Sequence, residues 1–201
     1  MARRTKEDAK ETRLLILKTA LDLFSNRGYS KVTFDEIAKQ IGLSKGAVYW
    51  HFKNKADLLS ALIREYHDTY GIEFCLQIDS LEDLKDIFIK KAKQIINDEQ
   101  LRKFFHFIFW QIEWSYPLFN TIEQSLSDIF NYPVCYLNKN LLNLQKNGQI
   151  SAEIDVDIAS QFIYSSWHGL LQAEVIKDKP NKKFTDIVEK SFNIIIKGLK
   201  K

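Results

Sequence analysis

The 201-residue chain has few of the residues that interrupt or cross-link a fold: seven glycines, three prolines and two cysteines. So little glycine and proline argues against a turn-rich β-sandwich or β-barrel. Cys75 and Cys135 stand far apart without a CxxC pair, which favours reduced thiols in a cytoplasmic protein over a disulfide framework. No apolar run reaches the roughly 18 residues that span a bilayer, and the charged start lacks the apolar core of a signal peptide. The sequence predicts a cytoplasmic protein that is not inserted in a membrane.

The signatures of common enzyme classes are missing as well. The sequence contains no GxSxG, HExxH, P-loop or GxGxxG motif, and its four histidines do not have metal-ligand spacing. We therefore expect a protein that is not an enzyme, with no catalytic residue, no metal site and no cofactor.

What the chain does have is a large apolar fraction, 45%, which recurs with a helical period in nearly every segment. The pattern predicts an all-α fold of about nine helices. The helix that begins near residue 118 is expected to kink or restart at Pro133, because proline cannot donate to the carbonyl one turn back. The expected ranges are 6–27, 34–40, a short helix from 45, 54–77, 81–97, 101–114, 118–146, 155–177 and 184–199.

Two short helices near the N-terminus carry the most specific pattern. Thr33 and Glu36 have the spacing of a capping box, and Ser44 can cap the next helix after a turn that contains Gly42. Such a pair, joined by a tight turn, is typical of a helix-turn-helix, which presents its second helix to the major groove of DNA. Asn54 can cap the long helix that follows, where backbone N–H groups and the helix dipole favour a phosphate.

Charge is distributed unevenly along the chain. Residues 1–55 contain twelve Lys or Arg and six Asp or Glu, a net charge of +6, whereas the remainder carries −3. A basic N-terminal segment on a mildly acidic body suggests that this segment binds a polyanion. A basic face that is merely solvated is the alternative.

The run from Val48 to Lys55, preceded by Thr33-x-x-x-Ile-Ala and Gly42-Leu-Ser, resembles the signature of TetR-family transcriptional repressors. The opening segment from Arg3 to Arg13 resembles the branch of that family that represses multidrug efflux pumps. The resemblance extends over about residues 1–70. It implies a helix-turn-helix DNA-binding domain over residues 1–54 and a helical ligand-binding and dimerisation domain over residues 55–201.

The resemblance also assigns roles to residues. Direct base contact from the second helix is not expected, because Asp35 and Glu36 are acidic. Arg3, Arg4 and Lys6 could form an arm in the minor groove or a solvated tail. For Tyr49 and Trp50 the alternative is packing against the first helix. The predicted DNA-binding residues are Lys45, Gly46, Ala47 and Tyr49 toward the bases, and Thr33, Ser44, Tyr49, Trp50, His51 and Lys55 on the backbone.

The last two helices have more apolar residues than one domain requires, and the family's dimers pack this pair against its symmetry mate. A homodimer through these helices is therefore expected, with an ordinary core helix pair as the alternative. The residues concerned are Val156, Ala159, Phe162, Ile163, Leu170, Leu171, Phe184, Ile187, Val188, Phe192 and Ile195.

Aromatic residues are dense between the two ends of the chain. Any one of them is readily explained as core, but together they suggest a mostly apolar cavity for a small hydrophobic effector. Glu113 could face a cation or be solvated, and His168 could bond a ligand or be a core histidine. By position in the family, the predicted ligand-binding residues are His67, Tyr70, Phe105, Ile108, Phe109, Tyr164, Trp167 and His168.

Together these features predict a homodimeric repressor that binds a palindromic operator in double-stranded DNA and is released by the effector. An efflux pump is the candidate target of its control. The alternative is a helical hydrophobe-binding module that acts at membranes. That module would need apolar residues opposite a lysine-rich helix face, and residues 45–55 do not segregate in this way.

Overall fold

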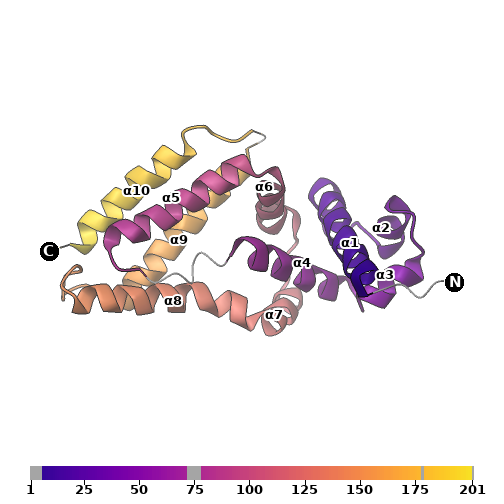
Figure 1. Cartoon of the computed structure of the whole chain (residues 1–201), viewed down its shortest axis with the longest axis horizontal. Helices are drawn as coiled ribbons and strands as arrows, with labels where there is room; N and C mark the ends of the chain where they lie inside the picture. Colours follow the sequence, from indigo (N-terminus) through magenta and orange to yellow (C-terminus); the bar gives the residue numbers. More distant parts are fainter. Residues whose placement is uncertain (1–5, 72–77, 178, 201) are drawn as a thin grey trace. The chain divides into compact units, whose positions relative to one another are not determined.

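The computed structural model describes residues 6–71, 78–177 and 179–200. Within these ranges it contains ten α-helices, one π-helical turn and no strand, so the all-α prediction is confirmed with one helix more than expected (Figure 1). No helix in the described part is long and apolar enough to cross a membrane. The elements are α1 (Lys6–Arg27), α2 (Phe34–Gln40), α3 (Lys45–His51), α4 (Lys55–Tyr70), α5 (Leu81–Asn97), α6 (Glu99–His106), η2 (Phe107–Gln111), α7 (Tyr116–Ser125), α8 (Ser127–Lys146), α9 (Val156–Val175) and α10 (Phe184–Leu199).

The helices pack into two compact units. The first holds the described residues up to Tyr66 together with Lys103–Leu126, and the second holds His67–Arg102 with the described residues from Ser127 onward. The two units are sets of residues that pack together, which does not show that either folds on its own. The predicted domain boundary after residue 54 therefore stays a prediction.

The starts of α2, α3 and α4 agree closely with the sequence, because side-chain caps fix them locally. The Thr33 hydroxyl and the Glu36 carboxylate form the predicted capping box of α2. The Ser44 hydroxyl accepts from the Ala47 N–H at 3.2 Å. The Asn54 side-chain oxygen accepts a hydrogen bond 2.9 Å long from the N–H of Asp57. Asn54 therefore caps α4, as predicted.

The predicted helix 101–114 is wrong at both ends. It begins at Glu99, because the Asp98 carboxylate accepts from the Leu101 N–H at 2.9 Å. Its α-helical part ends at His106, and the π-helical turn η2 continues the chain to Gln111. The Gln111 carbonyl at the end of this turn accepts a hydrogen bond, 3.0 Å long, from the backbone N–H of Tyr29.

The predicted restart at Pro133 is also wrong, whereas the alternative of a kink there stays a prediction. The chain breaks at Leu126, whose N–H bonds to the Glu123 carbonyl, one residue short of an α-helical turn. Leu126 is buried, and Pro133 lies inside α8. The helix predicted to begin near residue 118 would have left Pro117 before it. Pro117 lies instead in the first turn of α7, where its missing N–H is not needed for a helical hydrogen bond.

The helix predicted to reach Gln77 ends at Tyr70 as α4. The N–H of the next residue, Gly71, bonds back to the His67 carbonyl in a tight turn. Phe74 and Cys75 lie outside the described residues, as do the side chains of Phe130 and Tyr132. Arg3 and Arg4 of the expected arm are outside them too, whereas Lys6 opens α1.

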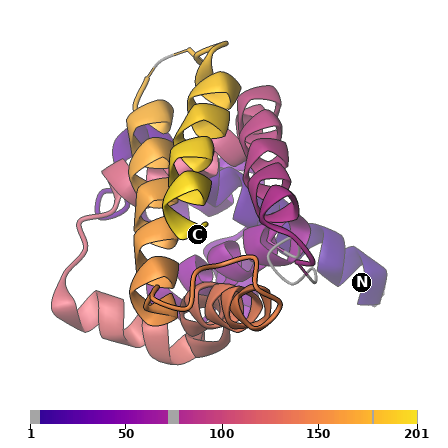
Figure 2. The same cartoon turned by 90° about the vertical axis from the view of Figure 1, so that its left-hand side faces the viewer.

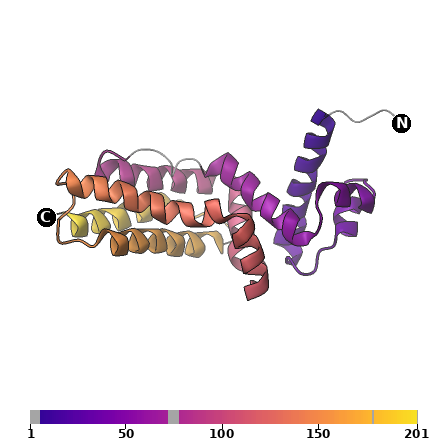
Figure 3. The ribbon, with the colours of Figure 1, turned by 90° about the horizontal axis from the view of Figure 1, so that it is seen from below.

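In the second unit, α5, α9 and α10 run alongside one another (Figures 1 and 2). The Phe88 ring stacks on Phe192 of α10 at 4.3 Å and meets Trp167 of α9 at 5.3 Å, which joins the three helices through one aromatic core. Helix α8 runs along α9 (Figure 3). Glu174, 1% exposed, accepts hydrogen bonds from Arg102 and from the Asn181 N–H, so this buried charge is fully compensated.

Candidate nucleic-acid interface

Helices α2 and α3 form the predicted helix-turn-helix in the first unit (Figure 3). The turn between them includes Gly42, whose φ of +67° falls in the left-handed region that glycine adopts without strain. Next to it, the Leu43 N–H donates to the Ala38 carbonyl at 2.9 Å. Ile37 and Val48 are fully buried, so the two helices are held together by their facing apolar sides.

The outer face of α3 is open to solvent. Lys45 and Gly46 are exposed, and the side chains of Tyr49 and Trp50 are 50% and 74% exposed. The Tyr49 ring touches Phe34 edge-on at 4.9 Å, which fixes its direction without burying its hydroxyl. Trp50 lies beside Ala9 of α1 but keeps 74% of its surface in solvent, which argues against the alternative that it packs against the first helix.

A groove of about 230 Å³ lies beside this face, lined by Ala9 of α1 and by Ala47, Trp50 and His51. The rings of Trp50 and His51 meet edge to face at 4.6 Å. Three of the predicted DNA-binding positions, Ala47, Trp50 and His51, therefore line one groove together with the start of α1.

Thr33 and Ser44 are engaged as caps. The Thr33 hydroxyl accepts from the Glu36 N–H at 3.3 Å, and the Glu36 carboxylate accepts from the Thr33 N–H at 2.9 Å. This backbone bond, helped by Arg27 at 2.6 Å, holds the pKa of Glu36 below its usual value. The first role of these two hydroxyls in the structure is to fix where the helices of the motif begin.

Lys45, the predicted base-facing lysine, is paired with Asp35 at 2.7 Å. The hydrogen bond to Asp35 raises the lysine pKa, so Lys45 is fully charged at neutral pH. Both side chains are exposed, and such a pair contributes little to stability. Lys45 can therefore exchange Asp35 for DNA at small cost.

Lys55 has a different environment from the other predicted DNA contacts. Its ammonium donates to the carbonyls of Ser30 and Val32, each at 3.0 Å, and lies 4.5 Å from the centre of the Tyr29 ring. Burial lowers its pKa. These bonds favour a role in fixing the α1–α2 loop over direct contact with phosphate.

Two hydrogen bonds of this unit were not indicated by the sequence. The Ser30 hydroxyl donates to the Glu113 carboxylate at 2.9 Å, and the Tyr29 N–H donates to the Gln111 carbonyl at 3.0 Å. Glu113 is exposed, as one alternative held, yet its hydrogen bond lowers its pKa. No local signal links residues so far apart in the sequence, so only a structure could reveal these contacts.

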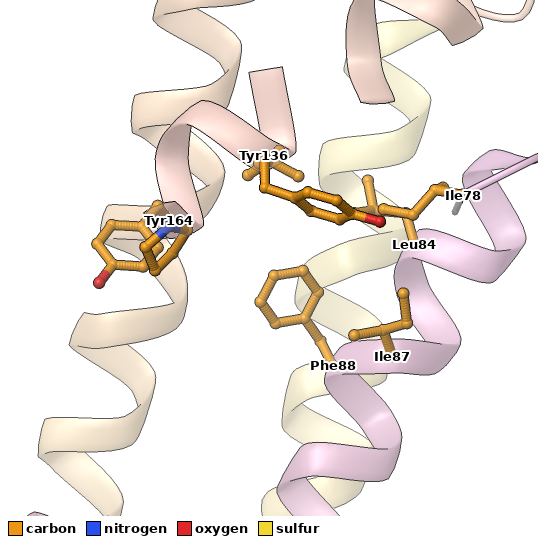
Figure 4. A pocket seen from close by; sticks show the side chains of 8 residues that line it. Ile78, Leu84, Ile87, Phe88, Tyr136 and Tyr164 are labelled. Carbon is orange, nitrogen blue, oxygen red and sulfur yellow. The ribbon is translucent and has the colours of Figure 1, made fainter. Parts of the chain in front are cut away.

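The second unit contains a small apolar cavity of about 10 Å³ (Figure 4). The hydroxyl of Tyr136 points toward Leu84 and Ile78, whereas the hydroxyl of Tyr164 points away from them. Burial raises the pKa of Tyr164, which keeps this phenol neutral. The lining comprises Ile78, Leu84, Ile87, Phe88, Pro133, Tyr136, Leu137 and Tyr164.

Of the predicted ligand-binding residues, Tyr164 lines this cavity. The His168 ring lies 4.3 Å from the Tyr164 ring, and burial lowers the histidine pKa, so the imidazole is neutral at neutral pH. Trp167 is 3% exposed and packs on Phe88, which favours a core role.

The other predicted ligand residues are divided between the units. Tyr70 belongs to the second unit and donates to Asp98 at 2.9 Å, and burial raises its pKa to about 12. His67, in the same unit, lies 3.3 Å from Asp68. Phe105, Ile108 and Phe109 belong to the first unit, where all three are half-buried and the rings of Phe105 and Phe109 stack at 6.0 Å.

Comparison with known proteins bears directly on this arrangement. The profile of the family described as "Bacterial regulatory proteins, tetR family" matches residues 16–62, which span α1 to α4. A transcriptional regulator of the helix-turn-helix type, TtgW of Pseudomonas putida, is 31% identical over 111 residues, which are 55% of this chain and 82% of that protein. The chain belongs to the TetR family.

Two further similarities extend the match. The transcriptional regulator AcrR of Shigella flexneri is 39% identical over 119 residues, 57% of this chain and 55% of that protein. The crystal structure of NalD, described as the secondary repressor of the MexAB-OprM multidrug efflux pump in Pseudomonas aeruginosa, superposes with a TM-score of 0.81. It is 23% identical and covers 98% of this chain and 99% of NalD, so the fold is shared along nearly the whole chain.

TetR-family membership confirms that the chain is a DNA-binding transcriptional regulator. It also agrees with the prediction that the chain is not an enzyme, because this is a family of regulatory proteins. In the part of the chain that the structure describes, no three His, Cys, Asp or Glu side chains gather as a metal site would require.

Proposed function

We propose that this TetR-family protein is a repressor that binds a palindromic operator as a homodimer and leaves it when a small hydrophobic effector binds. The observation that carries the proposal is the exposed outer face of α3 on a folded helix-turn-helix. Its Tyr49 and Trp50 side chains have no core to fill and have the size and polarity to meet a DNA groove.

The structure supports different roles for two sets of residues at the DNA, contact with bases and contact with the backbone. Lys45, Gly46, Ala47 and Tyr49 are placed to read base edges, since they lie on the first turns of an exposed recognition helix. Trp50 and His51, beside the groove next to α1, suit phosphate contacts. Thr33, Ser44 and Lys55 keep a place among the proposed backbone contacts, but their hydrogen bonds within the protein make positioning of the motif their main role.

Replacing Tyr49 or Lys45 by alanine should weaken binding to an operator selected from a random duplex library by about tenfold each, the loss expected for one good contact. Neither change should lower the thermal stability, because both side chains are exposed. Fluorescence anisotropy at fixed salt would measure the affinities.

Lys146→Ala is the matched control for charge, since Lys146 is exposed in the last turn of α8 in the second unit, away from α9 and α10. It should bind the operator as the wild type does. Selection of no operator by the wild-type protein would refute DNA recognition itself, while unchanged binding by both variants would refute this assignment of α3.

We further propose that the dimer forms through α9 and α10, along two stripes of exposed, uncharged residues. On α9, Ile158 and Phe162 are 68% and 60% exposed, and Gly169 and Ala173 continue the same face toward the C-terminus. A side chain at Gly169 would meet no atom of the chain within 4 Å, so its own fold does not require glycine there. A small residue lets a partner helix approach closely.

Helix α10 repeats this arrangement. Ile187 and Ile194 are 39% and 73% exposed, and Gly198 extends their stripe, where an added side-chain carbon would meet no atom within 4 Å. Exposed apolar stripes of this kind mark protein contacts. Most of the remaining apolar residues named for the dimer, such as Ile163 and Phe192, are buried in their own chain and belong to its core. Leu170 and Ile195 are half-buried.

The cavity in the second unit is our candidate effector site. At about 10 Å³ it has room for about one water molecule, whereas a drug-sized ligand needs several hundred cubic ångströms. Effector binding must therefore enlarge the cavity. A ligand that binds the enlarged state can shift the protein between two conformations, and a tenfold release from DNA needs a preference of about 1.4 kcal/mol.

Ile87→Trp should abolish the effector response, because the indole would fill the cavity that Ile87 lines. In a panel of hydrophobic drug-sized compounds, those that raise the melting temperature of the wild type should also weaken its operator binding. Ile89→Trp is the matched control, since Ile89 is also half-buried on α5 and does not line the cavity. A full response from Ile87→Trp would place the effector elsewhere.

Control of an efflux pump remains part of the proposal. It is supported by the described role of NalD and by the likeness of the first residues to efflux repressors. A repressor of this kind acts where the chromosome is, which makes the cytoplasm its proposed location. The alternative module at membranes is not favoured, because it leaves the exposed α3 face without a partner.

A further inference from the structure

The loop between α1 and α2 is held by the last residue of η2 and by the segment that follows it. The Ser30 hydroxyl bonds to the Glu113 carboxylate at 2.9 Å, and the Tyr29 N–H bonds to the Gln111 carbonyl at 3.0 Å. These two hydrogen bonds are called the loop contact below. They join the DNA-binding helices to a segment more than eighty positions away in the sequence.

Nearby groups reinforce the loop contact. Lys55 binds the carbonyl of Ser30 from the other side, and its positive charge lies close enough to interact with Glu113. Gly28, with a φ of +87°, brings the end of α1 against Gln111, where an added side-chain carbon would sit 3.9 Å from the Gln111 carbonyl. The loop is thus fixed by charge, backbone and shape together.

The loop contact lies at the end of a π-helical turn. Such turns are rare, widen the helix by one residue and are frequent at functional sites, because a change of register there displaces whatever follows. Phe107, the first residue of η2, is fully buried and stacks on Phe24 of α1 at 5.4 Å. The turn is therefore anchored at its start, and its register decides where Gln111 and Glu113 lie.

We propose that Glu113 and Gln111 are positioning residues for DNA recognition: through Ser30 and Tyr29 they hold the helix-turn-helix in the orientation that fits the operator. The proposal rests on the proposed function, since it assumes operator binding. It requires no DNA contact by Glu113 itself.

A substitution that removes the charge of Glu113 tests this proposal by the direction in which DNA affinity changes. Glu113→Gln removes a negative charge from the DNA-binding unit, which by charge alone should strengthen DNA binding. If Glu113 positions the motif, the same change should weaken it, because a neutral amide accepts a weaker hydrogen bond from Ser30. The two explanations thus predict opposite results.

The experiment compares Ser30→Ala, Glu113→Gln and the double variant on an operator selected by the wild-type protein and on an unrelated duplex. Each single variant should bind the operator about fivefold more weakly, and the double variant no more weakly than either single one, since both changes remove one bond. Affinity for the unrelated duplex should stay the same or increase. Glu153→Gln, an exposed carboxylate of the second unit, is the matched control and should not lose operator affinity.

The outcomes separate the two proposals. A wild-type protein that selects no operator refutes the proposed function. A wild type that binds its operator, with Glu113→Gln binding equally or more tightly, refutes the positioning role alone. Additive losses in the double variant, or equal losses on both duplexes, would also refute it, because they indicate independent or purely structural effects.

Discussion

Replacing Phe162 by glutamate should leave the protein folded but monomeric, and should weaken operator binding by at least about 100-fold. Phe162 is 60% exposed on α9, so the substitution does not disturb the core. In the proposed dimer it would bring two carboxylates into an apolar contact, where an unpaired charge is strongly unfavourable. Losing the partner removes the second half-site and with it the gain from linked binding.

Sedimentation at micromolar concentration would show the mass of one chain instead of two, and circular dichroism would verify that the helices remain. Leu142→Glu provides the matched control, because Leu142 is 39% exposed on α8 and receives the same charge away from both stripes. It should remain dimeric and bind the operator normally. A dimeric Phe162→Glu variant would show that α9 does not form the interface.

The parts of the fold that the sequence predicted well are those decided by a few neighbouring residues. Thr33, Ser44 and Asn54 start their helices because a side-chain oxygen accepts from the N–H three residues later, which requires no distant partner. The face of α3 was predictable for the same reason. Its buried Val48 and exposed Tyr49 follow from the helical period alone.

The wrong boundaries have tertiary causes. Pro133 lacks an N–H, which costs α8 one hydrogen bond, but its ring lines the cavity beside Tyr136 and the helix continues. The chain breaks instead at Leu126, which is 1% exposed. No residue type in the sequence predicts that the helix continues through Pro133 or that the chain breaks at Leu126. The π-helical register of η2 likewise depends on Phe107 meeting Phe24, a partner distant in sequence.

Most residues of the candidate effector site were not among those predicted from their positions in the family. The lining residues Ile78 and Leu84 come from the α5 side and Tyr136 from α8, and of the predicted set Tyr164 joins them. Ordinary apolar residues carry no signal that separates a cavity wall from a core. Packing decides the difference, because a cavity forms where neighbouring side chains fail to fill the space.

Phe107→Ala is expected to lower the free energy of unfolding by about 3–5 kcal/mol. Phe107 is fully buried, and its ring stacks on Phe24 at 5.4 Å with an interplanar angle of 18°. The Phe24 ring in turn meets Tyr29 at 5.3 Å. Truncation leaves a void between α1 and η2. It also removes the stacking of the two rings, which contributes about 0.5–1.5 kcal/mol beyond the area that the ring buries.

Urea-induced unfolding at fixed protein concentration would measure this loss, with Phe105→Ala as the matched control. Phe105 is half-buried, so its truncation should cost clearly less than that of Phe107. Phe107→Leu should recover part of the stability, since it refills most of the volume without the stacking. A loss from Phe107→Ala no larger than that from Phe105→Ala would mean that the Phe24–Phe107 contact does not hold η2 against α1. Because the loop contact lies at the end of η2, the helix-turn-helix would then need another support, and the register of the π-helical turn could not control it.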